Sequence, residues 1–182
     1  MFNLDNLQNY IDDALGTWHG SLEDPMNAGM KFFGENGELI DYLAKAMFKP
    51  NFKIDDEHII AEAGDAWYYF RILASMFDLT IDKYNELLEE TEKVSHNSNL
   101  ALMGISSGSI FSVCSMDSPQ DIKTNKESVQ LFLILWLNSF LRWLDETDIN
   151  FDYMHNYNVN KLSGSTNHGW KSDEPDTKKN TG

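Results

Sequence analysis

The sequence predicts an all-α protein, a bundle of about seven helices. Long segments carry apolar residues at positions i, i+3, i+4 and i+7, which is the pattern of an amphipathic helix. Few segments alternate apolar and polar residues as a half-buried strand does. The 182 residues include only 4 prolines, so helices can be long. At 42% hydrophobic and 13% aromatic residues, the chain has enough apolar side chains to form a core.

Four helices are expected in the first half, over residues 4–17, 25–48, 57–77 and from residue 80 to the polar segment "SHNSN". Pro25 suits the first turn of the second helix, and Asp24 before it suits the N-cap. The third helix follows two candidate caps, Asp55 and Asp56. Its inward stripe is expected to contain Ile59, Ala63, Trp67, Phe70, Leu73 and Phe77.

Three further helices are expected over residues 100–115, 127–144 and 151–162. The turn cluster "MDSPQD" separates the first two of them. Residues 129–144 are the most apolar stretch, but polar side chains interrupt it, and it is shorter than the roughly 18 apolar residues of a membrane span. We interpret it as a buried helix. The polar segment 163–182 is expected to be a flexible tail.

Charge and cysteine content narrow the functional classes. The formal net charge is -15, which argues against a nucleic-acid or anionic membrane surface, because such surfaces need clustered Lys and Arg. The single cysteine, Cys114, allows no internal disulfide. A reducing cytoplasm fits this composition, and the first ten residues lack the features of a secretory signal.

Two predicted helices each carry a pair of acids three residues apart. Glu35 and Glu38 lie in "GENGELIDYLAK", and Glu62 and Asp65 lie in "AEAGDAWYYF". Antiparallel packing of these helices would bring four carboxylates together, and buried carboxylates cannot all ionise without a cation. Oxygen ligands favour Mg²⁺, with Mn²⁺ as the alternative, over zinc. The competing interpretation places the acids on solvated helix faces.

The same segments resemble the MazG-like all-α nucleoside triphosphate pyrophosphohydrolases. "GENGELIDYLAKAMFK" and "IIAEAGDAWYYFRILASMFDLTIDKY" match that family's Glu-x-x-Glu and Glu-x-x-Asp signature with its aromatic flank, and "NYIDDALGTW" resembles its opening helix. The resemblance covers about residues 5–90. It implies Mg²⁺-dependent hydrolysis of an NTP or dNTP to the monophosphate and pyrophosphate. The related dimeric dUTP and dCTP hydrolases share this acidic bundle.

Hydrolysis of a phosphoanhydride needs neutralised phosphate charge and an oriented water molecule. A carboxylate that the metal does not saturate can orient the water, and both Glu35 and Glu38 are candidates. Further residues are candidates for contacts with the base or phosphates, with core packing or an exposed helix end as the competing interpretation: Trp18, Phe33, Lys45 and Trp67.

The second half resembles a degenerate copy of the first. "ALMGISSGSIFSVC" aligns with "GMKFFGENGELIDYLA", with serines at both positions of Glu35 and Glu38. Phe132 and Leu135 replace the acids of the other pair. The predicted domains are a MazG-like half at 1–96 with the metal site, a degenerate half at 97–162 and the tail.

The resemblance also implies a nucleotide-contacting Asn-x-x-Lys-Leu motif. It is absent from the first half, but Asn158 and Lys161 provide it in "NVNKL". We therefore expect a pseudo-dimeric chain in which the second half completes the nucleotide site of the first, with further homodimerisation as an option. The alternative function is a non-catalytic acidic module, either a DNA mimic or a degenerate nucleotide-binding protein.

Overall fold

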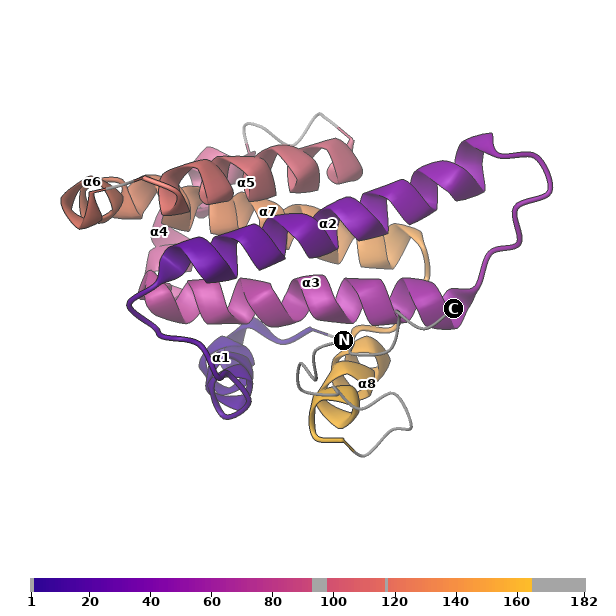
Figure 1. Ribbon diagram of the computed structural model, residues 1–182, viewed down its shortest axis with the longest axis horizontal. Coiled ribbons are helices and arrows are strands. Elements are labelled where there is room, and N and C mark those ends of the chain that lie inside the picture. Colours follow the sequence, from indigo (N-terminus) through magenta and orange to yellow (C-terminus); the bar gives the residue numbers. More distant parts are fainter. Residues whose placement is uncertain (1, 93–97, 117, 165–182) are drawn as a thin grey trace, which may run out of the picture.

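The computed structural model describes residues 2–92, 98–116 and 118–164, and every regular element in these ranges is helical (Figure 1). The predicted all-α class is confirmed. A 3₁₀ turn, η1 (Leu4–Asn6), precedes the first helix. The α-helices are α1 (Leu7–Leu15), α2 (Pro25–Phe48), α3 (Asp56–Met76), α4 (Ile81–Glu92), α5 (Asn99–Cys114), α6 (Pro119–Thr124), α7 (Lys126–Glu146) and α8 (Phe151–Leu162). The expected flexible tail lies outside the described residues from residue 165 onward.

Four long helices, α2, α3, α5 and α7, form the central bundle. α2 packs against both α3 and α5, and α5 packs against α7. α2 and α3 run antiparallel, and α1 and α8 lie on the side of α3 that faces away from α2 (Figure 1). The predicted inward stripe of α3 is confirmed, because all six of its residues are buried. Such apolar side chains stabilise a fold by about 1.5–3 kcal/mol each when fully buried.

The predicted buried helix is α7, and its interior positions pack against α5, α4 and α3. None of the described helices combines the length and the hydropathy that a membrane-spanning segment requires. One element differs from the expectation, because α6 occupies part of the predicted turn cluster. Pro119 starts this short helix, and the Ser118 hydroxyl accepts a hydrogen bond from the backbone N–H of Asp121, which is an N-terminal capping arrangement.

Helices of the two halves correspond in length and spacing. α3 and α7 each have 21 residues, and α4 and α8 each have 12 residues. The members of each pair begin seventy residues apart. Asp78 and Asp148, at the same spacing, both have positive φ, 49° and 59°. α8 packs on α3 while α4 packs on α7. These correspondences support the expected duplication, which stays a proposal.

Candidate metal centre

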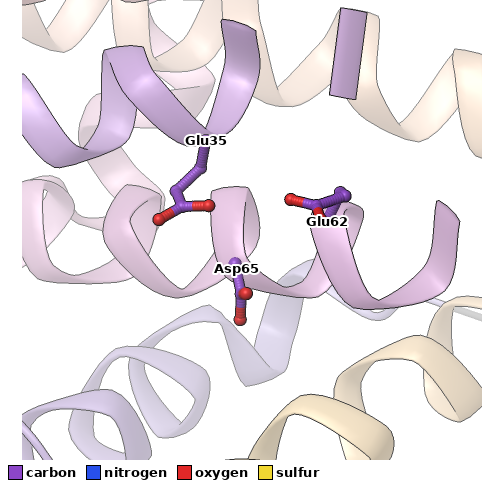
Figure 2. Close-up of side chains that lie close together, drawn as sticks. All are labelled: Glu35, Glu62 and Asp65. Atoms are coloured by element: carbon purple, nitrogen blue, oxygen red, sulfur yellow. The ribbon is translucent and has the colours of Figure 1, made fainter. Parts of the chain in front are cut away.

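Three carboxylates meet where α2 crosses α3. Glu35 points from α2 toward α3, and Glu62 and Asp65 come from successive turns of α3 (Figure 2). One carboxylate oxygen from each of these residues lies within 4.8 Å of the others. The spacing of Glu62 and Asp65 places them on one helix face, and the antiparallel partner supplies the third acid.

The local electrostatics disfavour three negative charges at this place. Burial, and then the charges of Asp65, Glu38 and Glu62, raise the pKa of Glu35 to about 7. Burial is also the main cause that raises the pKa of Glu62 and the pKa of Asp65. Carboxylates whose pKa values are raised by burial and by one another gain stability from a bound cation.

The C-terminal helix α8 supplies a cation and a hydrogen-bond donor to Asp65. The Lys161 ammonium donates to Asp65 Oδ2 in an ion pair. The Asn158 amide donates to Asp65 Oδ1 at 3.0 Å. Both bonds lower the pKa of Asp65 and so partly oppose the effect of burial. On the neighbouring turn, the distance from His58 Nε2 to Glu62 Oε1 is 3.5 Å.

Gly64 makes the close approach of α8 to α3 feasible. A Cβ atom at Gly64 would lie 3.0 Å from the Cβ of Asn158, which is tighter than ordinary van der Waals contact. The glycines of "GENGELIDYLAK" play no such part within the described chain. A Cβ at Gly34 or Gly37 would meet no atom within 4 Å, so the packing of α2 on its neighbours does not require them.

Three predicted site residues of α2 lie outside the group of three carboxylates. Glu38 is exposed, although its charge contributes to the raised pKa of Glu35, Glu62 and Asp65. Phe33 is 44% exposed and stacks on Phe111 of α5, with ring centroids 5.6 Å apart. Lys45 is exposed and forms an ion pair with Asp41 on its own helix.

Burial contradicts two of the predicted substrate contacts. Trp67 is 0% exposed, stacks on Phe70 and on Phe140, and donates from Nε1 to His155 Nδ1 at 3.2 Å. Asn158 is 1% exposed and is occupied by bonds inside the protein. The competing interpretation, core packing, is therefore correct for Trp67. Asn158 contacts Asp65 rather than the exterior.

Trp18 lines a cavity of about 390 Å³ next to the acids. Its ring meets Tyr69 edge-on at 6.3 Å. The charges of Glu35 and Asp65 help burial to raise the pKa of Tyr69, so this wall lies close to the carboxylates. The cavity is lined by Gly16, Thr17, Trp18, His19, Gly20, Asn27, Lys31, Tyr68, Tyr69 and Leu162.

Sequence reasoning missed three residues of this region. Lys31 precedes Glu35 by one helical turn and lines the cavity. His58 precedes Glu62 by one turn, so its spacing signalled the contact. Arg71 follows Trp67 by one turn on the buried face of α3, but a lone arginine gives no signal of its partner.

Comparison of the chain with protein-family models, curated proteins and solved structures gives no match.

Proposed function

We propose that this chain is a Mg²⁺-dependent nucleotide pyrophosphohydrolase, which converts an NTP or dNTP and water into the monophosphate and pyrophosphate. The observation that carries the proposal is the convergence of Glu35, Glu62 and Asp65 within 4.8 Å. The raised pKa values of all three carboxylates support it, because perturbed acids cluster at functional sites. The resemblance of the acidic segments to the MazG-like signature names the reaction.

The donor set fits a hard divalent cation. It consists of carboxylate oxygens, which suit Mg²⁺ and Mn²⁺, and it lacks the thiolate and imidazole ligands typical of zinc. Glu35, Glu62 and Asp65 would hold the ion. When bound, a divalent cation neutralises phosphate charge and polarises the bond to be cleaved.

The surrounding residues divide the remaining tasks. Glu38 is exposed, one turn from Glu35 and outside the group of three, so its carboxylate can orient the attacking water. The Lys161 side chain is 20% exposed beside Asp65, where its charge can reach a phosphate. The cavity walled by Trp18 and Tyr69 provides aromatic surface for the base.

Pyrophosphate release across all NTPs and dNTPs with Mg²⁺ tests the proposal. We expect release from at least one nucleotide, and its loss in Asp65→Asn, which keeps the shape of the side chain but removes its charge. Asp82→Asn is the matched control, because Asp82 is an exposed acid of α4, and it should retain full activity.

The same assay separates catalysis from the alternative function. Release that survives unchanged in Asp65→Asn would show that the acids are not the site. No release from any nucleotide, together with retained nucleotide binding, would favour a non-catalytic binding protein. Binding of a basic protein partner without nucleotide binding would favour the acidic DNA-mimic interpretation. That interpretation is based on the net charge of -15.

A further inference from the structure

Arg71 is a buried cation whose hydrogen-bond partners are neutral, although the charge of Asp13 also acts on it. It lies in α3, two helical turns beyond Asp65, and only 1% of it is exposed. Its guanidinium donates to the backbone carbonyl of Tyr10 at 3.2 Å and to Oδ1 of Asn158 at 3.1 Å. The rings of Trp67 and Tyr68 flank it at 5.5 and 5.7 Å. Within the described residues its Nε atom has no partner.

An arginine at this position is costly, because burial penalises its charge. Burial of a charge is costly, and apolar replacements of buried charges are often neutral or stabilising. Seventy residues later, the corresponding position of α7 holds Leu141, and α7 lacks the acids of α3. Burial lowers the pKa of Arg71 to about 10, which leaves it charged at neutral pH. The charge therefore occurs in the half of the chain that contains the carboxylates.

The chemistry of the guanidinium fixes the orientation of Asn158. Arginine has donors and no acceptor, so the oxygen of the Asn158 amide must face Arg71. The NH₂ group of the same amide then faces Asp65, and it donates to Oδ1 at 3.0 Å. Lys161 holds the other oxygen of Asp65. Both carboxylate oxygens are thus bonded from α8, while one of them still lies within 4.8 Å of an oxygen of Glu35 and of Glu62.

We propose that Arg71 is a positioning residue of the acidic site, which holds the Asn158 amide with its NH₂ group toward Asp65 and thereby fixes Asp65 as a ligand for a divalent cation. The inference rests on the proposed function for the presence of a cation at this site. Outer partners of metal ligands orient those ligands, and their loss typically costs about 10- to 100-fold in metal affinity.

The sign of the effect distinguishes positioning from bulk electrostatics. Removing a positive charge near a cation site strengthens cation binding by Coulomb's law. Removing the group that orients a ligand weakens cation binding. Arg71→Met deletes both the charge and the donors while it preserves much of the apolar volume, so the two accounts predict opposite changes.

Titration with Mn²⁺ alone, followed by electron paramagnetic resonance of the free ion, measures this sign. We expect Arg71→Met to bind Mn²⁺ about tenfold more weakly than the wild type. Asn158→Leu should weaken binding by a similar factor, and the double variant should be no weaker than either single variant. Arg142→Met is the matched control, because it removes an exposed arginine of α7, and it should not weaken binding.

Each outcome has a distinct meaning. Unchanged or tighter Mn²⁺ binding by a folded Arg71→Met would overturn the positioning role and leave the metal site intact. Additive effects of the two substitutions would also overturn it, because they would show that Arg71 does not act through Asn158. If Arg71→Met does not fold, unchanged binding by Asn158→Leu refutes the relay. A wild type that binds no Mn²⁺ would refute this inference and the proposed metal site together.

Discussion

Protonation of His155 should destabilise the fold between pH 7.5 and pH 5. The imidazole is buried in α8, and its Nδ1 accepts the hydrogen bond of the Trp67 indole at 3.2 Å. An accepting Nδ1 carries no proton, so the folded state requires the neutral ring. Burial, followed by the charge of Arg71, lowers the pKa of His155 from 6.5 to about 4, against the opposite influence of Asp13 and Asp152.

The pKa shift gives the size and the sign of the effect. Between pH 6.5 and pH 4 the unfolded chain binds a proton at His155 that the folded chain does not bind. Stability from this group is therefore complete above pH 6.5 and is lost as the pH falls toward 4. Linkage over this window predicts that about 2 kcal/mol of the free energy of unfolding is lost at pH 5 relative to pH 7.5.

Urea unfolding at pH 7.5 and pH 5, in the presence of a chelator, tests the prediction. Other groups also titrate in this range, so the informative quantity is the difference between the wild type and His155→Gln. Glutamine does not titrate, and its oxygen can accept the Trp67 hydrogen bond. His19→Gln, which alters an exposed histidine, is the control. Equal losses of stability in the wild type and His155→Gln would refute the reasoning.

Two further predictions concern the acidic site and its packing. Mn²⁺ should bind about tenfold more weakly at pH 6 than at pH 8. The reason is that the pKa of Glu35 is about 7 without a metal, and the ion must displace the proton of Glu35. Calorimetry measures the two affinities, and equal values would contradict this prediction. Gly64→Ala should destabilise the fold by about 1–3 kcal/mol through overpacking against Asn158, whereas Gly37→Ala should stabilise it by up to about 1 kcal/mol. Thermal unfolding compares the two, and a Gly64→Ala variant as stable as wild type would show that α8 shifts without cost.

The sequence sufficed for the helices and for the convergence of three of the four expected acids. The spacing of apolar residues is a property of each segment by itself, so it predicted both α7 and the inward stripe of α3. The same spacing placed Trp67 in that stripe, and its burial agrees with this prediction. The burial does not agree with the assignment of Trp67 as a substrate contact. Acid pairs on two consecutive helices joined by a short connection have one simple antiparallel arrangement, which brought Glu35 to Glu62 and Asp65.

Long-range side-chain partners could not be predicted in the same way. Whether Arg71 extends to solvent or lies buried depends on how α8 packs over α3. This helix begins eighty residues after Arg71 in the sequence. The burial of Asn158 depends on the same packing. A spacing of three residues places Glu35 and Glu38 on the same side of α2, but it does not tell which of the two faces α3. The signals for α6 were present in Ser118 and Pro119, but such signals also mark turns.

The contact of α8 with Asp65 sets an order of events during synthesis. A ribosome produces the acids of α2 and α3 early and Lys161 near the end of the described chain, and domains tend to fold from the N-terminus onward. A nascent chain thus contains the carboxylates before it contains their lysine. Until α8 is released, neither Lys161 nor Asn158 can compensate the charge of Asp65, and a metal ion or a proton can take that role.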